Sequence, residues 1–192
     1  VLRVMGMLVM IFASSLALPM AVSWWTRDGV LFVYPLSMAA TAFVGAWLWW
    51  SFRVFRRELQ PRHGVMLVSL VWLLLPLFAA LPLMLAGHHL GRPLSFTHAY
   101  FEAVSGLTTT GSTVMGGLDR LPVSVNVWRT FLQWLGGMGI LILAVAVLPL
   151  LGVGGSQLFK AEAAGPVQDA QLTPPMTGTA KGLRGVYALF SV

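Results

Sequence analysis

The stretch His98–Thr113, with the sequence HAYFEAVSGLTTTGST, decides the fold because it fits neither a membrane span nor an ordinary loop. Its first part, His98–Leu107, is moderately apolar and compatible with a helix, but it is too short to cross a bilayer. Ser95 precedes it at the position of a helix N-cap. Its second part, Thr108–Thr113, is polar and carries one glycine. We therefore predict a re-entrant segment over about residues 96–113, since irregular backbone at membrane depth is buried in protein or lines water.

The composition around this stretch predicts a membrane protein. Of the 192 residues, 57% are hydrophobic and 9% are charged, whereas a typical soluble domain is about one quarter charged. No soluble fold of this size buries so many apolar side chains, so we expect lipid to solvate much of the surface. The net charge of +6 does not indicate nucleic acid, because the arginines stand at the ends of apolar runs. The sequence has no cysteine, which excludes disulfides, thiol catalysis and thiolate metal sites.

Four apolar runs are long enough to span a hydrocarbon core of about 30 Å. They cover about residues 4–25, 30–52, 65–86 and 127–151. A cleaved signal peptide is the alternative for the first run, which is longer than a signal core. Pro76 and Pro82 lie inside the third run, where we expect kinks whose freed carbonyls find partners on neighbouring elements. The predicted fold class is an all-α membrane protein, with two leading transmembrane helices followed by one helix–pore loop–helix repeat of a potassium-channel-like pore.

The basic residues predict the orientation of these spans. If the N-terminus is cytoplasmic, eight Lys and Arg residues lie inside, and the four that lie outside are Arg27, Arg92, Arg120 and Arg129. This bias favours a cytoplasmic N-terminus. The predicted organisation is then residues 1–60 for two helices and a cytoplasmic loop, 61–155 for the helix–pore loop–helix repeat, and 156–180 for a polar, proline-containing cytoplasmic linker.

The segment Thr108–Ser112 has the residue types of a potassium filter. A dehydrated potassium ion is held by carbonyl oxygens that several chains or repeats aim at one axis, as in the TVGYG loop of potassium channels. Gly111 stands where that loop has its first glycine, at a position that requires a positive φ. We predict potassium ligands at Thr108, Thr109, Thr110, Gly111 and Ser112, with Thr109 and Thr110 as the principal ones.

Two observations limit this interpretation of the hexapeptide. Ser, Thr and Gly are also common in plain polar turns, which is the alternative for these residues taken alone. Thr113 occupies the place of the second glycine, and its presence predicts weaker selectivity than that of a symmetric tetrameric channel.

Other residues near this segment each allow two interpretations. Glu102 either supports the filter by accepting hydrogen bonds from loop amides or lies solvated at the outer interface. Arg129 fits headgroup anchoring at least as well as pore electrostatics. Gly136 and Gly137 allow either close helix packing, which we favour, or a hinge. The histidines lack acidic or cysteine partners at ligand spacing, so a metal site is not expected there.

From about Phe96 to Pro166 the sequence resembles the Trk/Ktr/HKT superfamily of potassium transporters, in particular the bacterial TrkH type. The resemblance is carried by an ordered series of segments: Phe101–Thr113, Leu118–Pro122, Trp128–Arg129, Gln133–Ile140, Leu148–Gly155, Gln157–Glu162 and Gly165–Pro166. Weaker similarity covers nearly the whole chain.

The resemblance implies an architecture that the residues alone do not. Members carry four span–pore loop–span repeats in one chain, preceded in the TrkH type by two extra helices. On this basis residues 61–155 form the first repeat, 181–192 begin the second, and the sequence is an N-terminal portion that supplies one quarter of a filter. The resemblance also implies a bacterial inner membrane, homodimers when full length, and a cytosolic nucleotide-binding regulatory subunit of the TrkA kind.

The predicted function is potassium transport across the plasma membrane, with potassium as the bound ion, membrane lipid as solvent and no organic cofactor. The alternative is a membrane scaffold or helix-packing module without transport of its own. A membrane enzyme is not expected, because the acids and histidines are scattered and form no nucleophile–base pair.

Overall fold

A computed structural model describes residues 1–53 and 61–147, and over these residues the chain is helical and contains no strand. The elements in chain order are α1 (Leu2–Ser15), α2 (Ala17–Thr26), α3 (Val33–Ser51), α4 (Pro61–His89), α5 (Phe96–Leu107), the short 3₁₀ helix η1 (Leu118–Arg120) and α6 (Val123–Val147). The chain divides into two compact units, Val1–Gly136 and Gly137–Val192. The arrangement below is that of the first unit.

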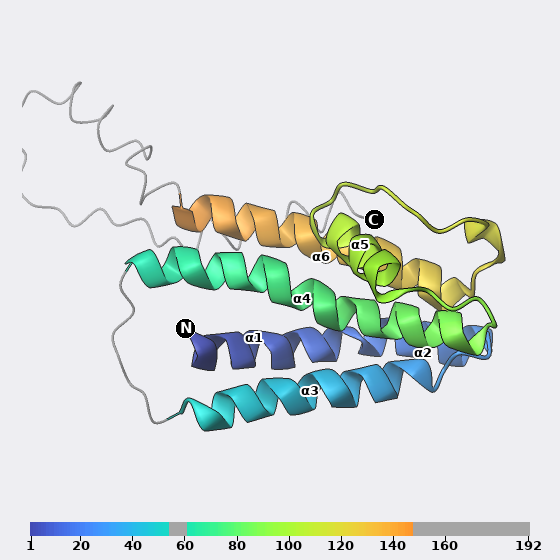
Figure 1. Ribbon diagram of the computed structural model, residues 1–192, viewed down its shortest axis with the longest axis horizontal. Coiled ribbons are helices and arrows are strands. Elements are labelled where there is room, and N and C mark those ends of the chain that lie inside the picture. The colour runs from blue at the N-terminus through green and yellow to red at the C-terminus, as the bar shows by residue number, and fades with distance from the viewer. Residues whose placement is uncertain (54–60, 148–192) are drawn as a thin grey trace, which may run out of the picture. The chain divides into compact units, whose positions relative to one another are not determined.

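The nearly continuous helix α1–α2 and the helix α3 form an antiparallel pair. Between α1 and α2, Leu16 keeps helical dihedrals (φ −67°, ψ −13°), so the chain is nearly one helix until Arg27 ends it at φ 52°. Gly6 on α1 and Gly45 on α3 let the two backbones approach, because a Cβ on Gly6 would lie 2.7 Å from the Gly45 carbonyl oxygen. Small residues at such contacts are typical of helix packing in membranes. Figure 1 shows α1 alongside both α3 and α4.

The long helix α4 continues through Pro76 and Pro82 without a break in its helical assignment. A proline lacks the N–H donor and its ring displaces the preceding turn. The carbonyls that the prolines free are those of Trp72 and Phe78, four residues earlier; the next carbonyl along the chain in each case accepts a side-chain hydrogen bond from another helix. Tyr100 Oη donates to the Leu73 carbonyl (3.1 Å), and the buried Trp128 Nε1 donates to the Ala79 carbonyl (3.0 Å). These bonds tie α4 to α5 and α6 next to each proline, and the expectation about the freed carbonyls themselves stays a prediction.

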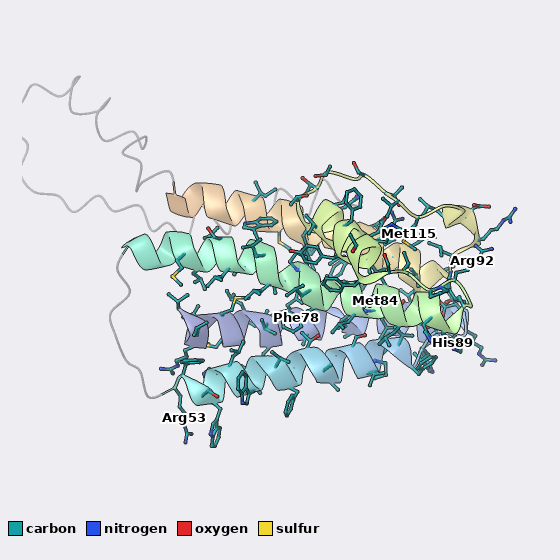
Figure 2. All side chains as sticks on the ribbon, viewed as in Figure 1. Arg53, Phe78, Met84, His89, Arg92 and Met115 are labelled. Atoms are coloured by element: carbon teal, nitrogen blue, oxygen red, sulfur yellow. The ribbon has the colours of Figure 1, made fainter. Side chains whose placement is uncertain are left out.

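The outer surface of the unit exposes many large apolar side chains. Exposed aromatic side chains include Trp25 (84% exposed), Phe43 (72%) and Trp47 (60%). Large contiguous apolar surfaces indicate contact with another apolar phase. Among the described residues, two helical stretches, Leu2–Thr26 and Met66–His89, are long and apolar enough to cross a membrane. Figure 2 places Arg53 and Arg92 at opposite ends of the bundle, as expected for residues on opposite sides of a bilayer.

The helices confirm the predicted helical segments and shift their limits. Both α4 and α6 begin four residues before the runs predicted at 65 and 127. The apolar runs missed the start of α6 because Ser124 and Asn126 interrupt the hydrophobic pattern there. The end predicted near 151, the linker at 156–180 and the second repeat at 181–192 lie outside the described residues. The division into domains stays a prediction.

Candidate functional site: a pore-loop segment

The site begins with α5, a helix of 12 residues. Ser95 caps it as predicted, because its Oγ accepts a hydrogen bond from the His98 amide at 3.2 Å. One face of the helix is buried; it consists of Ala99, Glu102, Ala103, Ser105, Gly106 and Leu107. The helix is too short to span a bilayer, as the length of the segment predicts, and the re-entrant placement stays a prediction.

The last turn of α5 closes in a Schellman pattern that leads directly into the candidate filter. The Thr110 amide donates to the Ser105 carbonyl and the Thr109 amide donates to the Gly106 carbonyl, both at 2.9 Å. This motif requires a left-handed residue just past the helix end, a position where glycine is usual. Thr109 occupies it at φ 58°. A β-branched residue with this φ is strained, and such strain clusters at functional sites.

The segment after this turn is fixed from one side and open on the other. Gly111 has φ 74°, which confirms the expectation that this position requires positive φ. Ser105 Oγ donates to the Ser112 carbonyl (2.7 Å), and the hydroxyls of Thr108 and Thr110 pair at 2.8 Å. The predicted ligands Thr108, Thr109, Thr110, Gly111 and Ser112 are all exposed and consecutive along this segment. Their backbone oxygens are the groups available here to replace the water shell of a cation.

Glu102 is a buried anchor for the chain that follows the filter segment. Its side chain is 2% exposed, and its Oε1 accepts hydrogen bonds from Thr113 Oγ1, the Val114 amide (2.7 Å) and the Met115 amide (3.3 Å). Its Oε2 accepts from Arg129 Nε (3.0 Å) and Nη2 (2.9 Å). A carboxylate taken out of water needs this pairing. The interpretation of Glu102 as a solvated interfacial acid is therefore wrong.

The position of Arg129 decides between its two interpretations. Its side chain is 16% exposed and makes a bidentate pair with Glu102, so the headgroup-anchor interpretation is wrong as well. The other ion pair among the described residues, Asp119–Arg120, is exposed and separated by 3.9 Å. Arg129 thus belongs to the pore-loop site.

Helix α6 packs closely against this segment. Gly136 faces the carbonyl oxygen of Leu107 so closely that a Cβ on Gly136 would overlap it. A Cβ on Gly106 would lie 3.0 Å from the Leu132 Cβ. The packing role favoured for Gly136 is confirmed. No cluster of three or more His, Asp or Glu side chains that could hold a metal ion occurs within residues 1–53 and 61–147.

A polar network at Asp28, which sequence reasoning missed, holds the start of α6. Asp28 Oδ2 accepts from the Ser124 amide (3.1 Å), and Asp28 Oδ1 accepts from Ser23 Oγ. Tyr34 Oη donates to Ser124 Oγ (2.7 Å). Partial burial raises the pKa of the Asp28 carboxyl, but hydrogen bonds from Ser124 and Ser23 outweigh it and bring the pKa below its usual value. The polar turn Thr26–Gly29, which separates the first two apolar runs and contains Asp28, was the sequence signal.

A helical bundle with a lipid-compatible surface, and a short helix followed by an ordered Thr/Gly segment, define a pore-loop membrane protein. The chain matches the family model TrkH, described as a cation transport protein, over residues 32–192. It belongs to this family, and the resemblance drawn from the sequence is confirmed.

Relatives with assigned names agree with this membership. The chain is 45% identical over 192 residues to the Trk system potassium uptake protein TrkH of Halomonas elongata, covering 100% of this chain and 39% of that protein. It is 42% identical over 190 residues to TrkH of Escherichia coli K12, covering 99% and 39%. Its fold matches the crystal structure of the potassium transporter TrkH from Vibrio parahaemolyticus with a TM-score of 0.79 and 37% identity, over 98% of this chain and 36% of that one. The chain thus spans about two fifths of the length of these relatives.

Proposed function

We propose that the chain takes part in potassium transport across the bacterial inner membrane and supplies one of four selectivity-filter segments. The observation that carries the proposal is the exposed segment Thr108–Ser112, which is held in a defined non-helical conformation between α5 and α6 with Gly111 at φ 74°. The relatives are named potassium uptake proteins, which supports potassium as the ion.

In this proposal the ion is held by backbone oxygens. The carbonyls of Thr109, Thr110 and Gly111 replace water around a dehydrated potassium ion. The Ser112 carbonyl already accepts a hydrogen bond from Ser105, so Ser112 would be a weaker ligand. One segment covers only part of the coordination shell of an ion, and equivalent segments from further repeats would complete it.

Glu102 would act as the support of this segment rather than as an ion ligand. Both of its oxygens are engaged by protein donors, three on Oε1 and two on Oε2. It therefore fixes residues 113–115, which leave the filter, and Arg129 neutralises its charge.

The remaining parts of the proposal follow from the charge pattern and the family. We expect a cytoplasmic N-terminus, a homodimer, a cytosolic nucleotide-binding regulatory subunit of the TrkA kind, no organic cofactor and no enzymatic activity. The positions of Arg53 and Arg92 at opposite ends of the bundle support their placement on opposite sides of the membrane, and the excess of basic residues on one side favours the orientation.

The experiment that tests the proposal replaces the filter glycine. Gly111→Val in the full-length transporter forces a β-branched residue to φ 74°, so rubidium uptake and the preference for potassium over sodium should both fall. Gly91→Val is the matched control, because Gly91 has φ 67° and open space around it but lies outside the filter segment. Unchanged uptake and unchanged preference in Gly111→Val would contradict the proposal and favour the alternative of a helix-packing module without transport of its own.

A further inference from the structure

Three residues of α6 contact consecutive parts of the pore loop. Arg129, Gln133 and Gly136 are spaced by four and three residues, so they lie on one face of the helix. Gly136 faces Leu107 at the end of α5, and Arg129 holds Glu102, which binds residues 113–115. The loop therefore runs antiparallel to α6 over about two helical turns.

Gln133 stands in the middle of this face, next to the filter glycine. Its Nε2 lies 3.6 Å from the position that a Cβ on Gly111 would occupy, and no other atom beyond the chain neighbours of Gly111 comes within 4 Å of that position. The side of Gly111 that would carry a side chain thus faces the carboxamide of Gln133.

The chemistry of Gln133 is unusual for its surroundings. From Phe131 to Ile140 the helix otherwise consists of apolar residues, glycines and Trp134. The Gln133 carboxamide is half-buried and makes no hydrogen bond to any part of the chain that the structure describes. What this side chain brings to Gly111 is therefore its length, which carries the terminal carboxamide from α6 to the filter segment.

We propose that Gln133 is a specificity-determining positioning residue that backs the filter at Gly111. Its side chain limits the displacement of the backbone between Thr110 and Ser112 and thereby fixes the distance of the carbonyls from the ion. A filter segment with free space behind it can adapt to more than one ionic radius. Removal of the Gln133 side chain, which forms the wall behind Gly111, therefore lowers the discrimination between potassium and sodium while the ligands themselves remain. This inference rests on the proposed function of Thr108–Ser112 as a filter segment.

The test compares Gln133→Ala with Gln133→Met in the full-length transporter reconstituted into lipid vesicles. The alanine variant removes the side chain behind Gly111, and the preference for potassium over sodium should fall severalfold because the filter backbone can then adjust to a second ionic radius. The methionine variant keeps the length of the side chain and should retain most of the preference. Thr130→Ala, an exposed position on the same helix, is the control and should leave the preference unchanged.

The readout is a ratio of two ion fluxes, so it does not depend on how much protein reaches the membrane. If Gln133→Ala does not assemble, Gln133→Ser removes the same wall and keeps a polar group. An unchanged ratio in the alanine or serine variant overturns the proposal, and so does an equal loss in the methionine variant. If Gly111→Val lowers the ratio while these variants do not, only the role of Gln133 is lost; if Gly111→Val has no effect, the filter assignment itself fails.

Discussion

The carbonyl oxygen of Leu107 lies against Gly136, so that the end of the short helix α5 rests directly on the backbone of α6. The contact leaves room for a Cα hydrogen and for no side chain. Such Cα–H···O contacts recur where glycines allow helices to approach. Because Leu107 immediately precedes the candidate filter, this contact sets where the filter segment begins relative to α6.

Gly136→Ala adds only one methyl group, but it should destabilise the contact between α5 and α6. The added methyl group would overlap the Leu107 carbonyl and force α5 and α6 apart, at a cost of about 1–3 kcal/mol. We expect a lower thermal unfolding temperature in detergent and reduced rubidium uptake. Gly116→Ala is the control, because nothing lies within 4 Å of its added Cβ and it should change neither quantity. Equal behaviour of the two variants would show that the close contact is not required.

Glu102→Gln should destabilise the protein strongly, because it leaves Arg129 half-buried without its charged partner. Breaking a buried pair in this way costs about 3–5 kcal/mol. The double variant Glu102→Gln with Arg129→Gln should cost less than the sum of the two single variants, as expected for coupled residues. Chemical unfolding of the purified protein measures all three.

Asp119→Asn is the control for the variants of Glu102 and Arg129. The Asp119–Arg120 pair is exposed on both sides, so its loss should change stability by about 0–1 kcal/mol. Additive effects of Glu102→Gln and Arg129→Gln would contradict the assignment of these two residues to one anchor.

Asp28 links the leading helices to the pore-loop repeat, and this link should depend on pH. The pKa of Asp28 is lowered in the folded protein, so its stabilising contribution is fully present above the ordinary value of 3.8 and is lost as the pH falls through the lower folded-state pKa. Capping interactions of this kind contribute about 0.5–2 kcal/mol. The difference in unfolding temperature between the unaltered protein and Asp28→Ala should be constant near neutral pH and shrink in acid. A difference that grows in acid would reverse the assigned sign.

The local features of the site could be predicted from the sequence, whereas its long-range pairs could not. The Ser95 cap and the positive φ of Gly111 depend on a few neighbouring residues, whose chemistry the sequence displays. Glu102 and Arg129 are 27 residues apart, and Asp28 and Ser124 are 96 apart. A single sequence shows which groups are charged but not which of them meet, and an arginine at a span end fits an interfacial anchor equally well.

Thr109 shows a different limit of prediction. A β-branched residue disfavours the left-handed region, so propensity predicts an extended conformation there. The helix-end motif imposes the left-handed conformation on whichever residue follows the cap, and here that residue is a threonine. The hydrogen-bonding pattern of the helix end thus overrides the preference of the residue itself at the first position after the helix cap.

Thr109→Gly should consequently raise the stability of the protein and lower its preference for potassium over sodium. Glycine adopts φ 58° without strain, and the relief of about 1–2 kcal/mol exceeds the added flexibility of the unfolded chain, which costs about 0.5–1 kcal/mol. The unfolding temperature should rise slightly, while the preference for potassium over sodium falls because the segment is less stiff. Thr109→Val keeps the branched side chain and the strain but lacks the hydroxyl, so it should leave stability unchanged and isolate any contribution of the hydroxyl to selectivity. A lower unfolding temperature in Thr109→Gly would mean that contacts of the threonine side chain outweigh its backbone strain, and the conformation at this position would then be stabilised by the side chain rather than imposed by the helix end.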